Sequence, residues 1–318
     1  MYKFFLRRIA DSLSLSIILE ASAYPKPGNV HRTRDRKGLR YEAFLATGVL
    51  ASKYFEKGIR RGYKGFRNVL IGDLVYGVVR EVIDDLKSTN TCLGSSLILS
   101  AISVAVGALY IKGELKFENI GRAVREVIEN TTVYDSIYYY KAIRKANPSY
   151  LKQSDNTGEY VNVWDPFYRR KLLEKNHRLI DVLVYSSKID LVSDEILNAL
   201  SRGFEAETFL RSRIIDHGDL NRAIVETYLY MLSRNRDTVV YLKHGIDISK
   251  EVSNKAEKIL DQVLRSGTEW VDIVSVFDNE LQLRGINPGS VADLTAEVIA
   301  LYLLRNILDK NTLLDLSI

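Results

Sequence analysis

The chain has 318 residues, 46% of them hydrophobic and 27% charged, which is the composition of an ordinary globular protein with a large core. Its formal net charge is only +5, and its Lys and Arg residues are interspersed with acids. This pattern argues against nucleic-acid binding and leaves anionic small molecules as the expected partners. The single cysteine excludes an internal disulfide and a cysteine-rich metal site, and the four histidines lack zinc-type spacing.

The sequence carries no clear targeting or membrane-spanning signal. The first 15 residues are amphipathic and lack the apolar core and small-residue cleavage site of a signal peptide. The longest mostly apolar run, 97–111, contains serines and is too short to cross a bilayer. We therefore expect a cytoplasmic protein without membrane association. Abundant Lys, Arg, Glu and Tyr with only three Gln are typical of a thermophile.

Helical periodicity dominates the chain, because apolar residues recur at spacings of three and four. The only alternating runs, 161–163 and 239–242, are too short to build a sheet. We therefore predict an all-α fold of about a dozen helices, in a single compact domain over 1–318. The polar segment 147–165 is predicted to be a functional loop. The predicted helices cover 6–24, 41–62, 73–87, 95–111, 117–129, 134–146, 166–185, 193–213, 220–234, 249–265, 269–284 and 290–309.

The junction after the first predicted helix, 24–32, combines two prolines and a glycine with cationic and polar residues. Pro25 and Pro27 fix φ and disfavour helix at the residues before them, so the loop should be stiff. Lys26 lies between these prolines and is predicted to bind phosphate. The alternative is a plain helix stop with solvated charges. The candidate binding residues of this loop are Lys26, Gly28, Asn29, His31 and Arg32.

The junction 89–96 precedes the most apolar predicted helix and is rich in hydroxyl and amide side chains. A helix N-terminus offers free N–H groups and the positive end of the dipole, which suits a phosphate. Asn90, Thr91 and Gly94 are therefore candidate binding residues, although plain N-capping by Thr or Ser explains them equally well.

Three further junctions carry polar clusters. In 142–148, a basic helix end breaks before Pro148, and Asn147 is the candidate, with ordinary dipole pairing by Lys and Arg as the alternative. In 236–245, Asp237 and Thr238 could cap a short helix that ends at Lys243 and His244. In 287–293, Ser290 followed three residues later by Asp293 resembles a capping box, so local capping also explains Asp293.

Each of the five junctions lies at a helix end and combines polar groups with Gly or Pro, so we expect all five to converge on one cleft. Together these junctions read PKPGxV, NTxxG, AIRxANP, DTxxxxxxG and PGxxADL, in that order. In this respect the chain resembles the triphosphoribosyl-dephospho-CoA synthase family, from about Glu20 to Leu304. The family is all-helical, in agreement with the periodicity. Its members join ATP to 3′-dephospho-CoA: the 2′-hydroxyl of the acceptor attacks C1′ of the ATP ribose, adenine leaves, and the triphosphate stays on the transferred ribose.

The resemblance implies the chemistry that the site must supply. A carboxylate must take the proton of the attacking hydroxyl, and the triphosphate needs cations, helix N-termini and Mg²⁺ held by carboxylates. The candidate catalytic carboxylates are Glu20, Asp35 and Glu42, and the candidate Mg²⁺ ligands are Asp237 and Asp293. The candidate substrate-binding residues are Lys26, Gly28, Asn29, His31, Arg32, Asn90, Thr91, Gly94, Asn147, Thr238, His244, Pro288 and Gly289.

The chain departs from the usual pattern of the family at two of the motifs. Where the family usually has a His and an Asp, this chain has Arg40 and Glu42, and the His and Lys of the second motif are replaced by Cys92 and Leu93. These changes imply a divergent, archaeal branch that uses dephospho-CoA or a related acceptor. The oligomeric state stays open, with a homodimer as one alternative. Two other functions stay open, an N-ribosyl hydrolase of nucleotides or phosphosugars and a non-catalytic nucleotide-binding protein.

Overall fold

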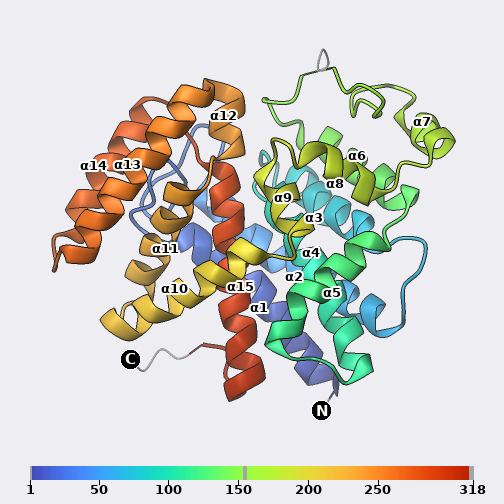
Figure 1. Ribbon diagram of the computed structural model, residues 1–318, viewed down its shortest axis with the longest axis horizontal. Helices are drawn as coiled ribbons and strands as arrows, with labels where there is room; N and C mark the ends of the chain where they lie inside the picture. The colour runs from blue at the N-terminus through green and yellow to red at the C-terminus, as the bar shows by residue number, and fades with distance from the viewer. Residues whose placement is uncertain (1, 153–155, 315–318) are drawn as a thin grey trace.

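The computed structural model describes residues 2–152 and 156–314, and within them the chain forms fifteen α-helices and one short 3₁₀ helix, η1 (Figure 1). No strand longer than an isolated bridge occurs in these residues, so the all-α prediction is confirmed. The elements are α1 (Tyr2–Ser22), α2 (Tyr41–Tyr63), α3 (Gly72–Asp84), α4 (Leu93–Lys112), η1 (Phe117–Asn119), α5 (Ile120–Glu129), α6 (Val133–Ala146), α7 (Tyr168–Lys175), α8 (Leu179–Ser186), α9 (Leu191–Leu197), α10 (Ser201–His217), α11 (Leu220–Arg234), α12 (Thr238–His244), α13 (Ile246–Arg265), α14 (Trp270–Leu283) and α15 (Gly289–Lys310).

Two of the predicted helices are each divided in the structure. The predicted helix 166–185 breaks at Asn176, which ends α7 in the left-handed region at φ 48°, a conformation that asparagine tolerates. The predicted helix 193–213 breaks at Ala199 and Leu200, whose φ values are 55° and 63°. The Leu200 side chain is fully buried there, and its packing offsets the cost of the unusual backbone. Apolar periodicity continues across both breaks and therefore hid them.

Helix α4 forms the centre of the core. It extends beyond the apolar run 97–111, so that by length and composition it could cross a bilayer, contrary to the expectation from that run alone; but 83% of its most apolar stretch is buried inside the fold. Its close contact with α2 depends on glycines: a Cβ on Gly62 would lie 1.9 Å from the Val104 carbonyl oxygen, and one on Gly107 would lie 2.0 Å from the Ile59 carbonyl oxygen. The apolar length of α4 therefore serves packing among neighbouring helices.

Helix α15 runs between two groups of helices (Figure 1). Helices α10 to α14 lie on one side of it, and α2 to α9 lie on the other. It packs against α10, α11 and α12 from the first group, and against α4 and α9 from the second. Because α15 joins the two groups, its first turn lies where residues from both can meet.

Candidate active site

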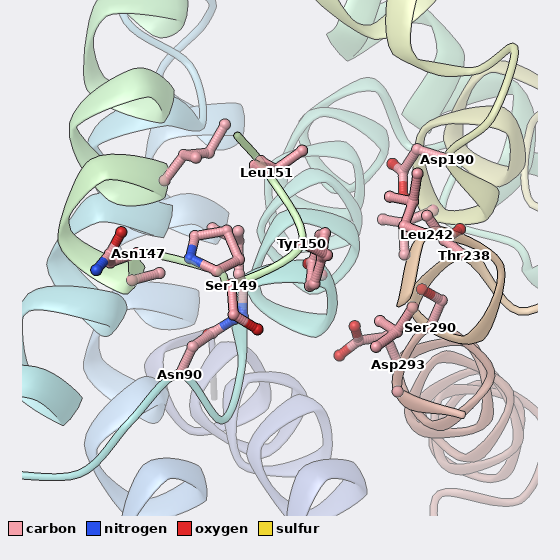
Figure 2. A pocket seen from close by; sticks show the side chains of 18 of the residues that line it. Asn90, Asn147, Ser149, Tyr150, Leu151, Asp190, Thr238, Leu242, Ser290 and Asp293 are labelled. Carbon is pink, nitrogen blue, oxygen red and sulfur yellow. The ribbon is translucent and has the colours of Figure 1, made fainter. Parts of the chain in front are cut away.

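A cavity of about 1100 Å³ lies between the two groups of helices, at the first turns of α4 and α15 (Figure 2). All five polar junctions contribute to its wall, so their predicted convergence is confirmed. The predicted binding or catalytic residues that line it are Glu20, Asn29, Asn90, Thr91, Gly94, Asn147, Thr238, Gly289 and Asp293.

Carboxylates link the N-terminal ends of different helices at this cavity by accepting hydrogen bonds from their backbone N–H groups. Asp293 lies just after the first turn of α15, and its Oδ1 accepts a hydrogen bond of 2.9 Å from the backbone N–H of Ser95 on α4. Asp237 accepts one from Val240 N–H of its own helix, at 2.9 Å, and one from Val291 N–H of α15, at 2.8 Å. The capping-box interpretation of Asp293 is therefore wrong, because α15 begins without a side-chain cap and Asp293 serves α4 instead.

Burial raises the pKa values of these carboxyl groups. The pKa of Asp293 is about 8, mainly because of burial and further because Glu20 and Asp190 carry like charge nearby, although the amide of Ser95 opposes the shift. Burial raises the pKa of Asp237 to about 6. Burial also raises the pKa of Asp190, which lines the cavity and caps α9. Perturbed carboxyl groups gathered in one cavity are typical of a functional site.

Gly94 permits the close approach of α4 to Asp293. A Cβ added to Gly94 would lie 2.2 Å from Asp293 Oδ2, which is too close for any residue other than glycine. The glycine of the NTxxG motif is therefore explained by this contact between two helix N-termini.

Glu20 and Lys26 form a buried ion pair beside the cavity. The Lys26 ammonium donates to the Glu20 carboxylate and, at 2.7 Å, to the Glu20 backbone carbonyl oxygen. Burial raises the pKa of Glu20 and lowers that of Lys26, and the pairing opposes both shifts. Glu20 belongs to the cavity wall, whereas the Lys26 side chain is 1% exposed and lies behind it. The structure thus places Lys26 as the partner of Glu20 and not at the cavity surface.

The remainder of the first loop is fastened to α14 by Asp278. This buried carboxylate accepts hydrogen bonds from Gly28 N–H at 2.9 Å, from His31 Nε2 at 3.1 Å and from Arg34 Nη1 at 2.7 Å. Gly28 adopts φ 72°, and a Cβ there would lie 2.7 Å from the Ile286 carbonyl oxygen. In this structure Gly28 and His31 shape the loop, and neither reaches the cavity wall.

The structure does not bring every candidate to the cavity. Asp35 and Glu42 are exposed: Asp35 accepts from the N–H of Tyr41 at 2.8 Å, and Glu42 pairs with Arg40. The remaining candidates away from the wall are the exposed Arg32, the N-cap Asp237 and the end residue His244 of α12, and Pro288, whose carbonyl oxygen accepts from Asn29 Nδ2 at 3.0 Å.

Sequence reasoning did not identify many residues of the cavity wall, among them Tyr139, Tyr150, Asp190 and Ser290. Tyr139 lies within a helix and Tyr150 within the polar insert, so neither belonged to a recognisable pattern. Asp190 precedes α9 as an ordinary N-cap, accepting from Ser193 N–H at 2.9 Å, and an N-cap signal does not reveal what else a carboxylate faces.

The described residues contain no group of three or more His, Cys, Asp or Glu side chains placed to hold a metal ion by themselves. Both oxygens of Asp237 already accept backbone hydrogen bonds. Asp293 uses Oδ1 for Ser95 and keeps Oδ2 beside Gly94 at the cavity wall. Since Mg²⁺ in nucleotide sites is commonly held by one or two carboxylates, phosphate oxygens and water, Asp293 fits such an ion better than Asp237 does.

The family model, the curated relatives and a solved structure that resemble this chain all carry related names. The model of the family described as CitG: ATP:dephospho-CoA triphosphoribosyl transferase matches residues 6–312. A Salmonella typhi protein named "Probable 2-(5''-triphosphoribosyl)-3'-dephosphocoenzyme-A synthase 1" is 24% identical over 293 residues, which cover 88% of this chain and 85% of that protein. A Salmonella typhimurium protein of the same name has the same identity and coverage. A crystal structure from Archaeoglobus fulgidus, provisionally named triphosphoribosyl-dephospho-CoA synthase, shares the fold with a TM-score of 0.62 and 23% identity, covering 82% of this chain and 98% of that one.

Proposed function

The chain belongs to the ATP:dephospho-CoA triphosphoribosyl transferase family, and from this premise we propose that it transfers the 5-triphosphoribosyl group of ATP to the 2′-hydroxyl of 3′-dephospho-CoA. The bond between C1′ and adenine breaks as the bond between C1′ and the acceptor oxygen forms. The proton lost by the hydroxyl balances the proton that the leaving adenine takes up. The observation that carries the proposal is the meeting of two long helix N-termini with buried carboxylates in one large cavity.

The first turns of α4 and α15 supply the binding site for the triphosphate in this proposal. Both helices have at least 20 residues and direct the positive ends of their dipoles to the same cavity. Several of their first N–H groups already donate to Asn90, Asp293 and Asp237, so the dipole ends supply the attraction for phosphate oxygens in this proposal. Lys37 and Lys243 at the rim supply positive charge that attracts the polyanion.

Glu20 is the best-supported base among the candidate carboxylates. It lines the cavity, whereas Asp35 and Glu42 are exposed elsewhere. Its raised pKa makes it a stronger proton acceptor than an ordinary glutamate, and Lys26 holds it in place. The negative charges of Glu20 and Asp190 also stabilise positive charge that develops at C1′ in the transition state.

Mg²⁺ is a proposed companion of ATP, with Asp293 as its protein ligand and phosphate oxygens and water completing its shell. When bound, the ion would neutralise triphosphate charge. Because the pKa of Asp293 is about 8, ion binding there would displace a proton at neutral pH. We further propose that the enzyme works in the cytoplasm, where both nucleotides are available, and acts only on small molecules.

Adenine release tests the proposal directly. The protein is incubated with ATP and Mg²⁺, with and without 3′-dephospho-CoA, and the products are separated by chromatography. We expect adenine and a triphosphoribosylated product that depend on the acceptor, and loss of both in Glu20→Gln but not in the exposed control Asp261→Asn. Adenine formed equally without acceptor would indicate a hydrolase, and binding of ATP without adenine release would indicate a non-catalytic protein. Either result overturns the proposal.

A further inference from the structure

One wall of the cavity is aromatic, and the proposed chemistry leaves it unused. Tyr150, Trp164 and Tyr185 all line the cavity and are only partly buried, so they are not ordinary core residues. Tyr150 and Trp164 come from the segment between α6 and α7, and Tyr185 comes from α8. Figure 2 shows Tyr150 between Asn147 on one side and Thr238 and Asp293 on the other. Tyr150 therefore faces the N-terminal end of α15, where Asp293 lies.

Trp164 is held in place by its neighbours. The Arg144 guanidinium lies 6.0 Å from the Trp164 ring centre and 5.0 Å from that of Tyr168. Arg144 Nη1 also donates to the Val163 carbonyl oxygen at 2.8 Å. Arg144 thus holds both the backbone beside Trp164 and the Trp164 ring. Because the ring is already ordered, stacking of a ligand on it would cost little side-chain entropy.

Tyr185 is held by residues from the middle of the same segment. Its ring centre lies 4.5 Å from that of Tyr160, and its hydroxyl donates to the Asn156 carbonyl oxygen at 3.3 Å. The neighbouring Lys188 is exposed and also lines the cavity. This end of the cavity therefore combines flat aromatic surface with a cation, which suits a nucleotide.

The two ends of the cavity differ in depth. Glu20 and Asn29, near the helix N-termini, are 5% exposed each, whereas Asn156 and Lys188 at the aromatic end are exposed. A 3′-dephospho-CoA molecule carries a long pantetheine arm that needs an exit to solvent, and ATP carries none. The open aromatic end therefore fits the acceptor, and the deep end fits ATP.

We propose that Trp164 and Tyr185 form a stacking subsite for the adenine ring of the acceptor nucleotide. This inference rests on the proposed function and deepens it, because it places both nucleotides in one cavity. The cavity volume of about 1100 Å³ exceeds the roughly 300–1,000 Å³ that one small ligand usually occupies. Lys188 pairs with the acceptor diphosphate in this arrangement.

Fluorescence can test the subsite without any turnover. The chain has two tryptophans, and Trp270 lies outside the cavity wall, so Trp270→Phe leaves Trp164 as the sole reporter. We expect saturable change of its emission on titration with 3′-dephospho-CoA, no change with the purine-free 4′-phosphopantetheine, and an intact response in saturating ATP. The same titration of Trp164→Phe should show no change. A response abolished by ATP, or equal for 4′-phosphopantetheine, would overturn the proposal.

Steady-state kinetics supply the second test. Trp164→Leu and Tyr185→Leu should each raise the KM for 3′-dephospho-CoA by about tenfold, the size expected from loss of one base stack, and leave the KM for ATP within about twofold. Phe167→Leu is the matched control, because Phe167 is an exposed aromatic of the same segment outside the cavity. A rise in the KM for ATP alone would contradict the assignment. If no variant turns over, the fluorescence titration still decides the subsite separately from the proposed function.

Discussion

Replacing Asp293 by asparagine separates its effect on stability from its proposed role in binding. Its pKa in the folded protein is about 8, raised mainly by burial from an ordinary value of 3.8. Asparagine has nearly the same shape, and its amide oxygen can still accept the hydrogen bond from Ser95 N–H. The change therefore removes a titrating group and leaves the brace between α15 and α4 in place.

The sign of the effect follows from linkage. Because the pKa of Asp293 is higher in the folded state than in the unfolded state, the protonated carboxyl stabilises the fold. This contribution to the free energy of unfolding is fully present below pH 3.8 and is lost as the pH rises through about 8. Between pH 6 and pH 8 the Asp293 carboxyl is ionised in the unfolded chain but stays largely protonated in the folded protein. While this difference holds, the free energy of unfolding falls by about 1.4 kcal/mol for each pH unit. For Asp293 the free energy of unfolding should fall by at most about 2 kcal/mol over this interval, since its partial exposure lowers the full value.

Denaturant unfolding followed by far-UV circular dichroism at pH 6, 7 and 8 measures this difference. We expect Asp293→Asn to be more stable than the wild type throughout this range, by a margin that grows from pH 6 to pH 8, and to release no adenine from ATP in the presence of 3′-dephospho-CoA. The control Asp261→Asn, an exposed aspartate on α13, should follow the wild type in both assays. Parallel stability curves for Asp293→Asn and the wild type, or full activity of the variant, would refute the reasoning.

Three further predictions follow from the neighbouring contacts. Gly28→Ala should lower the melting temperature more than Gly65→Ala, because both glycines have positive φ but only Gly28 would clash with a carbonyl oxygen; equal shifts would contradict this. Lys26→Met should cost about 3 kcal/mol of unfolding free energy by leaving Glu20 unpaired, and adding Glu20→Gln should restore part of it; no recovery would exclude the buried pair. The kcat/KM should fall at acidic pH through an apparent pKa above 4.5, as the raised pKa of Glu20 requires, and a profile flat to pH 4.5 would rule out Glu20 as the base.

The sequence predicted the helices well because their apolar periodicity is a local property. It also predicted that the five polar junctions converge, since each one ends or begins a helix with Gly or Pro and side chains of the same chemistry. The assignment of roles within those junctions was harder. Lys26 and Glu20 are six residues apart, and Lys26 pairs with Glu20 from behind the cavity wall, an arrangement that depends on tertiary packing.

Residues outside the motifs were missed for a related reason. Asp278 holds the first loop from about 250 residues away, and nothing in its own helix distinguishes it from a surface aspartate. Tyr139 and Tyr150 contribute to the cavity only because α6 and the segment after it fold towards α15. Local sequence specifies which residues begin a helix, whereas the cavity is a property of how the helices meet.

The hydrogen bonds between the first loop and Asp278 have a consequence for synthesis of the chain. Gly28 and His31 bind Asp278, which the ribosome adds about 250 positions later. Asn29 likewise donates to the carbonyl oxygen of Pro288, which is added later still. A nascent chain that ends before α14 therefore has the early motif but no means of fixing it, and contacts so distant in sequence form slowly. Nucleotide binding should arise only after α15 has emerged, which makes the incomplete polypeptide inert towards cellular ATP.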